Sequence, residues 1–320
     1  MSEISTFPDS VQATPSARTE EIRALIRVHK RHDRLFALIG LLAMMVGILT
    51  LLALFTQMIV DGLPRLSPEF FTHFASRRAG QAGILSAWVG SILVMMVTAF
   101  FAVPVGIASA IYLEEYARRN WFTDVIEINI SNLAGVPSIV YGLLALGLFV
   151  YTFGFGQSIL SAGLTLALLI LPIVIVTTRE ALRSIPQHIR EAAYGCGASK
   201  WQVVIDHLLP YGTPGILTGV IIGMARAIGE TAPIITIGAL TFIAFLPPLP
   251  GTGEPPAGLF DWLFSPFTVM PIQIFNWTSR PDPAFQQNAA AASLVLVVMT
   301  LGMNGLAIWL RYHLRKSIKW

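Results

Sequence analysis

The sequence predicts an all-α membrane protein with six transmembrane helices. Hydrophobic residues make up 54% of its 320 residues and charged residues only 12%, whereas a soluble domain carries about 25% charged residues. A helix needs about 20 consecutive apolar residues to cross the hydrocarbon core. Apolar windows of at least this length occur at 35–60, 84–113, 130–151, 158–178, 213–245 and 289–310.

The distribution of Lys and Arg predicts that both termini are cytoplasmic. With that orientation the inside segments carry 16 Lys and Arg residues, and the outside segments carry four, at Arg65, Arg77, Arg78 and Arg280. An excess of basic residues in cytoplasmic loops is the usual pattern in membrane proteins. The net charge of +3 follows from this asymmetry, so it gives no reason to expect a nucleic-acid partner.

The first 34 residues are expected to form a tail and an interfacial helix. Residues 1–17 are rich in Ser, Thr and Pro and predict disorder, and 18–34 alternate basic and apolar residues as in helices that lie on the inner leaflet. The window 35–60 is too long for the apolar region of a cleaved signal peptide, so it is expected to be an anchor. The single cysteine, Cys196, excludes an intrachain disulfide.

Two long loops carry recognisable patterns. The outside loop 246–288 contains nine prolines and several aromatic residues, which predicts either a segment dipping into the outer leaflet or a docking surface for an outside partner. The inside loop 179–212 predicts two short helices. The first ends at the glycines 195 and 197, and the second begins with a capping-box pair, Ser199 and Gln202, and ends at Pro210.

The inside loop resembles a known sequence motif. Glu191-Ala192-Ala193 is followed by Gly197 and then, after nine intervening residues, by His207-Leu208-Leu209-Pro210. This spacing is similar to the EAA loop of binding-protein-dependent ABC importer permeases, with His207 in place of the usual isoleucine. The resemblance implies that Glu191, Ala192, Ala193 and Gly197 couple the chain to a cytoplasmic ATPase.

Three further segments narrow the resemblance to permeases of phosphate ABC importers. The last of them favours the PstA-type subunit, because the PstC-type partner usually reads Gly-Glu-Thr-Met at that point. The resemblance covers about residues 80–310. The three segments begin Pro104-Val105-Gly106, Gly135-Val136-Pro137-Ser138 and Arg226-Ala227-Ile228-Gly229-Glu230-Thr231-Ala232-Pro233.

This resemblance implies a MetI-like, type I importer permease core at 80–312 in the plasma (inner) membrane of a bacterium or archaeon. It further implies a second permease of the PstC type, a PstB-type ATPase dimer, a PstS-type extracytoplasmic binding protein and inorganic phosphate as substrate, besides membrane lipid. The chain itself contains no Gly-Lys dipeptide and therefore no Walker A loop. We expect a permease subunit that is not itself an enzyme and needs no cofactor or metal.

Two opposite charges, Arg226 and Glu230, lie inside the apolar window 213–245. A charge at the bilayer centre costs about 2.5–3.5 kcal/mol on insertion scales and usually marks a transport path or a relay. On a helical wheel both charges fall within the face formed by Gly215, Gly219 and Gly223, which predicts that they face another helix or a pathway rather than lipid.

Two hypotheses follow for this pair. In the first, Arg226 and Glu230 neutralise each other and hold a helix interface together. In the second, Arg226 transiently binds an oxyanion through its planar guanidinium group, Glu230 prevents the anion from being trapped, and Thr231 lies on the same path. The residues alone do not separate phosphate from sulfate or molybdate.

Two functions of other classes are also considered. A channel or secondary transporter could use Glu230 as a proton site, but the EAA loop would then have no role. An intramembrane enzyme would need a nucleophile with a base, or metal ligands, at membrane depth. The sequence has no Gly-x-Ser-x-Gly motif, no histidine inside a predicted span and no metal-ligand cluster, so it predicts no catalytic residues.

Overall fold

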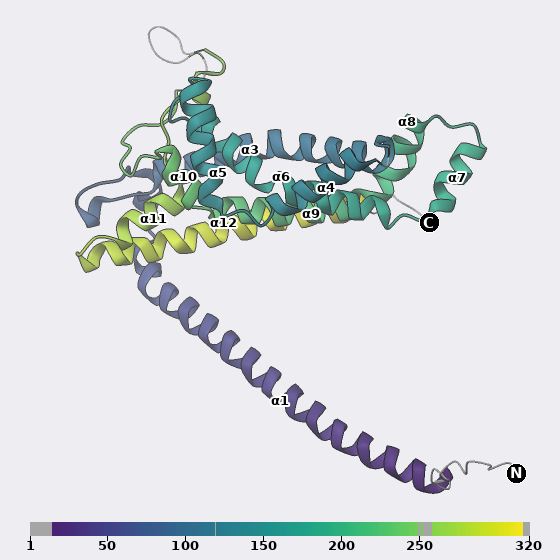
Figure 1. Cartoon of the computed structure of the whole chain (residues 1–320). Helices are drawn as coiled ribbons and strands as arrows, with labels where there is room; N and C mark the ends of the chain where they lie inside the picture. The colour runs from purple at the N-terminus through teal and green to yellow at the C-terminus, as the bar shows by residue number, and fades with distance from the viewer. Residues whose placement is uncertain (1–14, 119, 249–250, 252–257, 316–320) are drawn as a thin grey trace, which may run out of the picture. The chain divides into compact units, whose positions relative to one another are not determined.

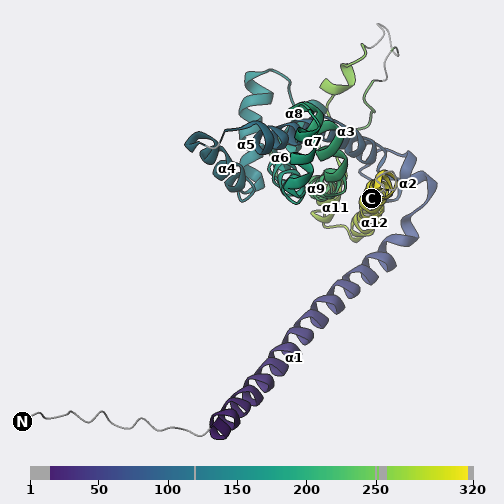
Figure 2. The same cartoon turned by 90° about the vertical axis from the view of Figure 1, so that its right-hand side faces the viewer.

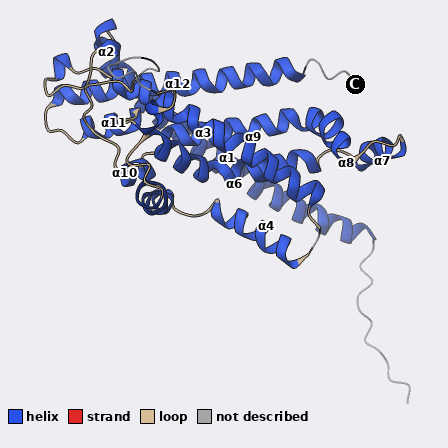
Figure 3. Cartoon of the chain, turned by 90° about the horizontal axis from the view of Figure 1, so that it is seen from above, coloured by secondary structure: helices blue, strands red, loops and turns tan. Residues whose placement is uncertain are grey.

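The computed structural model describes residues 15–118, 120–248, 251 and 258–315, and in these residues every regular element is helical (Figure 3). The chain divides into two units, 1–57 and 58–320. The principal helices are α1 (Pro15–Gly62), α3 (Leu85–Ile111), α4 (Trp121–Leu133), α5 (Ser138–Ala145), α6 (Ile159–Arg183), α7 (Gln187–Gly195), α9 (Leu209–Gly229), α10 (Ala232–Ile237), α11 (Met270–Thr278) and α12 (Pro283–Arg315). Shorter elements are η1 (Leu63–Arg65), α2 (Pro68–Thr72), η2 (Ala79–Gln81), α8 (Lys200–Gln202) and η6 (Asp261–Phe264), with π-helical turns η3 (Tyr112–Tyr116), η4 (Leu146–Thr152) and η5 (Val203–Leu208).

The first unit consists of the N-terminal part of α1. This helix runs without interruption from Pro15, so the segments 18–34 and 35–60 belong to one helix rather than two elements. Its start also lies inside the segment 1–17 that the sequence predicted to be disordered, while residues 1–14 lie outside the described residues. The apolar side chains between Leu35 and Leu54 are exposed, as expected for a helix surrounded by lipid.

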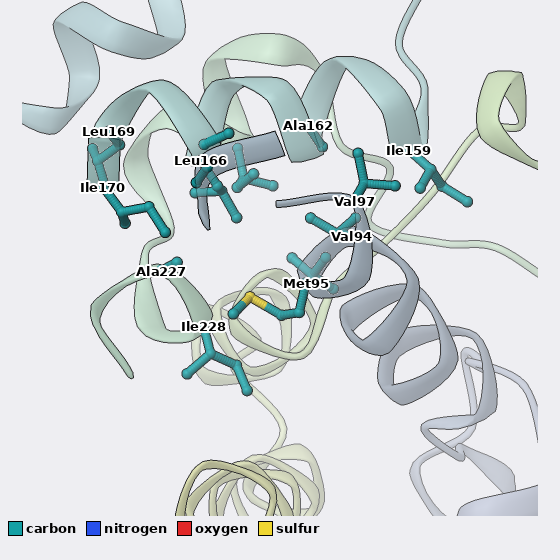
Figure 4. Close-up of a cluster of buried hydrophobic side chains, with 14 of the residues drawn as sticks. Val94, Met95, Val97, Ile159, Ala162, Leu166, Leu169, Ile170, Ala227 and Ile228 are labelled. Carbon is teal, nitrogen blue, oxygen red and sulfur yellow. The ribbon is translucent and has the colours of Figure 1, made fainter. Parts of the chain in front are cut away.

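In the second unit α6 is the central helix. It packs against α3 on one side and α9 on another, and α12 runs along α9 (Figures 1 and 3). Figure 4 shows the core between them, where Val94 and Val97 of α3, Leu166 and Ile170 of α6 and Ala227 of α9 meet. Elements α7 and α8 project from one end of this bundle, and α10 and α11 lie at the other (Figures 1 and 3).

Glycines allow α6 and its neighbours to approach closely. A Cβ atom at Gly219 of α9 would lie 2.5 Å from the Cβ of Thr177 on α6, and one at Gly163 of α6 would lie 2.6 Å from the Cβ of Val97 on α3. Small residues at helix crossings provide close packing in membranes, where the hydrophobic effect does not drive helices together.

The third predicted span, 130–151, is sharply bent. The structure has two helices here, α4 and α5, and their axes are bent by 108°. The turn at Gly135 and Val136 precedes Pro137, which disfavours helical geometry in the residue before it. The part of the chain that the structure describes therefore contains five helices able to cross a membrane, or six if this bent pair is one span.

The fifth predicted span, 213–245, is also corrected. Helix α9 ends at Gly229, Glu230 is extended (φ −76°, ψ 124°), and the short helix α10 follows. Pro233 lacks an amide hydrogen, so a continuous helix could not satisfy the carbonyl four residues earlier. Beyond the left-handed Gly238 the chain is irregular up to Pro248.

The outside loop 246–288 contains regular structure that the sequence did not predict. Within its described residues lie η6, helix α11 and the start of α12. Trp277 of α11 is fully buried beside Phe70 and Phe285. This segment therefore closes one end of the bundle through an apolar cluster.

We expect Gly219→Ala to destabilise the permease. The new methyl group meets the Cβ of Thr177, and such overpacking costs about 1–3 kcal/mol. Thermal unfolding of the protein purified in detergent measures the change, and Gly47→Ala in α1, where nothing lies within 4 Å, is the matched control. An equal melting temperature for both variants would contradict the close contact.

Candidate functional site

Arg226 and Glu230 form an ion pair at the break between α9 and α10. The Nε atom of Arg226 lies 3.3 Å from Oε1 of Glu230, and the side chains are 38% and 19% exposed. Within the described residues, Nη1 and Nη2 of Arg226 donate no hydrogen bond and Oε2 of Glu230 accepts none. The pair therefore keeps free donors and a free acceptor side by side.

The predicted position of the pair within the glycine face is wrong. The face with Gly219 and Gly223 is buried against α6, and Ala227 and Ile228 continue it, whereas Arg226 is exposed. Each step of four residues turns a helix by about 40°, so the buried stripe has rotated away from Arg226 at its level. Glu230 is extended backbone, where a helical wheel no longer applies.

Helix α5 lies directly beside this break. A Cβ atom at Gly142 would be 2.6 Å from Cα of Pro233 and 1.8 Å from the Thr236 hydroxyl, so α5 and α10 touch through their backbones. The hydroxyl of the neighbouring Tyr141 donates to the carbonyl of Leu133 at 2.7 Å. Thr231 is half-buried at the start of α10 and its hydroxyl makes no capping hydrogen bond.

The EAA residues lie on α7, at the end of the bundle away from this break (Figure 1). Ala193 is 4% exposed and packs in an apolar cluster with Leu182, Val204 and Leu208. Glu191 and Ala192 are exposed. The motif thus anchors α7 with its last residue and leaves the first two free for a partner.

The turn after α7 is fixed by backbone and side-chain geometry. Gly197 has φ +84°, a left-handed conformation that costs other residues about 1–2 kcal/mol. The predicted capping box is confirmed, because the Ser199 side chain and Gln202 bond reciprocally. The predicted helix end at Pro210 is wrong: η5 runs directly into α9, Pro210 lies in the first turn of α9, and the helix continues to Gly229.

A cluster of charged side chains joins η3, α4, α6 and α7, and the sequence did not predict it. Glu114 accepts from Arg179 at 3.4 Å and from Arg183 at 2.8 Å, and Arg179 also pairs with Glu127 of α4. Glu115 accepts from Arg190 of α7 at 3.0 Å. The partners are 52 to 75 residues apart in sequence, so no local spacing signals them.

Within the described residues, no group of three or more His, Cys, Asp or Glu side chains is placed to hold a metal ion. The charged groups form ion pairs, helix ends and an exposed motif.

Residues 102–320 match the family of binding-protein-dependent transport system inner membrane components. The chain belongs to this family. It is therefore a multi-pass permease of the inner membrane in an ABC importer, and it is not itself catalytic. Such a transporter also has a partner permease, an ATPase and a binding protein.

Curated relatives cover most of the chain. It is 35% identical over 222 residues to the phosphate transport system permease protein PstA of Mycobacterium leprae, covering 69% of this chain and 68% of the relative. It is 31% identical over 271 residues to the probable ABC transporter permease protein YqgI of Bacillus subtilis, covering 84% and 91%. The resemblance to PstA-type permeases is thereby confirmed.

Solved structures share the fold. A chain of the bacterial alginate ABC transporter aligns with TM-score 0.64 and 13% identity, covering 89% of this chain and 96% of that one. A chain of the MetNI methionine ABC transporter aligns with TM-score 0.54 and 14% identity, covering 71% and 93%. The identities are too low to say anything about substrate.

We expect Gly197→Ala to weaken retention of the ATPase. Alanine strains the left-handed turn that positions α7, and the cost of about 1 kcal/mol falls on the coupling loop alone. Copurification of the ATPase with the tagged permease measures the effect. Gly195→Ala, two residues earlier with nothing within 4 Å, should retain the ATPase at the level of the unsubstituted protein; equal retention in both variants would argue against a coupling role of the turn.

Proposed function

We propose that this permease imports inorganic phosphate. It would form the translocation path with a PstC-type permease, on a PstB-type ATPase dimer and supplied by a PstS-type binding protein. The α4–α5 pair would serve as one bent span, giving a MetI-like core with six spans and both termini in the cytoplasm. Sulfate and molybdate remain the alternative substrates against which the proposal is tested.

The observation that carries the proposal is the guanidinium group of Arg226 at a break in a membrane helix, where two of its nitrogens donate no hydrogen bond to any described residue. A planar guanidinium group binds the oxygens of a tetrahedral oxyanion through two parallel hydrogen bonds. An arginine at this depth is costly unless a pathway or partner solvates it. Its partial exposure in the single chain is consistent with a path shared with the second permease.

Glu230 favours phosphate over a fully deprotonated oxyanion. Its free Oε2 atom can only accept a hydrogen bond while it is ionised. Hydrogen phosphate carries a P–OH group that can donate to this atom while its other oxygens accept from Arg226, whereas sulfate offers acceptors alone and is repelled. Glu230 also occupies Arg226 when no substrate is present, which keeps the anion from binding too tightly.

The coupling role of Glu191, Ala192, Ala193 and Gly197 is part of the same proposal. Helix α7 presents Glu191 and Ala192 to solvent and is held to the bundle by Ala193. We infer that α7 seats in the ATPase, so that ATP-driven closure of the two ATPase subunits moves it.

We expect Arg226→Gln and Glu230→Gln each to abolish ATP-dependent phosphate uptake in proteoliposomes that contain the whole transporter and its binding protein. The first change removes the anion donor, and the second lets the anion remain bound to Arg226. Assembly is checked by copurification of the partner subunits.

The control is Arg118→Gln, an exposed arginine outside the helices, which should import phosphate at the unsubstituted rate. If both test variants took up phosphate at the rate of the unsubstituted transporter, the proposed role of Arg226 and Glu230 in transport would be refuted. If the unsubstituted transporter imports sulfate or molybdate instead of phosphate, the proposed substrate is wrong and the proposed anion site at Arg226 still stands.

We also expect Glu230→Gln to reduce discrimination between anions. The amide of glutamine can donate to an oxyanion oxygen, so sulfate is no longer repelled. Competition of sulfate against radiolabelled phosphate, measured on the detergent-purified transporter without binding protein, should become at least tenfold more effective. An unchanged competition ratio would show that Glu230 does not select the anion.

A further inference from the structure

The charged cluster at the α7 end of the bundle joins α7, η3, α6 and α4. Arg190 lies on α7, one residue before the EAA motif, and its guanidinium group donates to Glu115 at 3.0 Å and to the carbonyls of Ile185 and Leu182 at 2.8 and 2.9 Å. These bonds fix α7 to η3 and to the end of α6. A displacement of α7 is therefore transmitted to η3.

Glu114 and Glu115 are adjacent in η3, so they move together. Glu114 accepts from Arg179 and Arg183 of α6, and Arg179 extends to Glu127 of α4. The side chains are largely buried, with Arg179 and Glu115 each 9% exposed and Glu114 and Arg190 each 16% exposed. Buried, mutually paired charges have few alternative partners, so they hold a defined arrangement better than surface pairs do.

Helix α4 is the element with the weakest packing at the other end of this chain of contacts. None of its residues is buried, and it lies at the edge of the bundle, on the side opposite α12 (Figures 2 and 3). Two of its side chains, Ile126 and Ile130, pack against a small buried cluster. The ion pair of Glu127 is thus a principal tie between α4 and α6.

Contacts continue from α4 to the candidate substrate site. The Tyr141 hydroxyl bonds the last carbonyl of α4 across the bend, and Gly142 presses α5 against Pro233 and Thr236 of α10. Helix α10 begins two residues after Glu230. A movement of α4 therefore reaches the break that holds Arg226 and Glu230 through contacts without a gap.

We propose that Arg190–Glu115 and Glu114–Arg179–Glu127 form an ionic linkage that carries the movement of α7 to the bent α4–α5 segment and so opens or closes the path at Glu230. These five side chains are positioning residues, because none of them touches the substrate. The linkage rests on the assignment of an ATP-driven permease and not on the identity of the anion.

The test is the ratio of substrate imported to ATP hydrolysed, measured in proteoliposomes with the whole transporter. Glu127→Gln removes the tie to α4 while keeping the size of a side chain that is 33% exposed. We expect the assembled transporter to continue hydrolysing ATP and its import per ATP to fall at least tenfold. The matched control is Asp124→Asn on the same helix, an exposed residue without an ion pair in the described part of the chain, which should keep the unsubstituted ratio.

Exchanging the charges of Arg190 and Glu115 tests the end of the linkage at α7. Arg190→Glu and Glu115→Arg should each lower the ratio, and the double variant should recover at least a third of it, because the pair is restored with reversed polarity. A merely structural role would lower import and hydrolysis together, in proportion to assembled transporter, and would overturn the linkage. The linkage would also be overturned if Glu127→Gln imported as much substrate per ATP as the unsubstituted transporter. The same holds if the double variant imported no more substrate per ATP than the single variants.

The outcome is separable from that of the proposed function. If the unsubstituted transporter imports another oxyanion, the ratio is measured with that anion. Loss of phosphate specificity then leaves the test of the linkage intact.

Discussion

A helix break inside a membrane must be shielded, because the hydrocarbon core offers no water to the unpaired backbone groups. This permease has two such breaks, between α4 and α5 and between α9 and α10. The contact of Gly142 with the backbone of Pro233 and the hydroxyl of Thr236 places the second half of one broken span against the second half of the other. The contact packs α5 against the chain that follows the second break, where Glu230 is half-buried, whereas Ala134, Gly135 and Pro137 at the first break are exposed in the single chain.

The packing of α9 on α6 explains the position of Arg226. Helix α9 uses its glycine face for α6, and the exposed side of its last turn carries the guanidinium group. The face with Gly219 therefore fixes α9 to α6, and the neighbouring exposed face carries Arg226. A rigid α6–α9 pair with a break at its end keeps the charge fixed in the bundle while the chain after it can respond to α5.

The charged cluster gives a physical basis for communication between the EAA loop and the distant break. Rigid helices joined by buried, specific contacts transmit displacement from one end of a bundle to the other. Here the contacts run from Arg190 through Glu115 and Glu114 to Arg179 and Glu127. The loosely packed α4 is the element that such a displacement can move at the lowest cost.

The fold class, the approximate spans and the EAA loop could be predicted because they depend on local composition and spacing. Apolar length identified α3, α6 and α12, and the capping box of Ser199 and Gln202 marked the start of α8. The sequence also drew attention to Arg226 and Glu230, because charge in an apolar window is conspicuous whatever the fold.

What the tertiary structure decided is where helices stop and which charges meet. Pro137 and Pro233 could bend or end a helix, and only packing against the neighbouring segments made each a break with a fixed direction. The exposure of Arg226 depends on how the buried stripe of α9 rotates along its contact with α6. Glu114 finds Arg179 across 65 residues, and a pairing at that distance is set by the arrangement of helices rather than by any pattern along the chain.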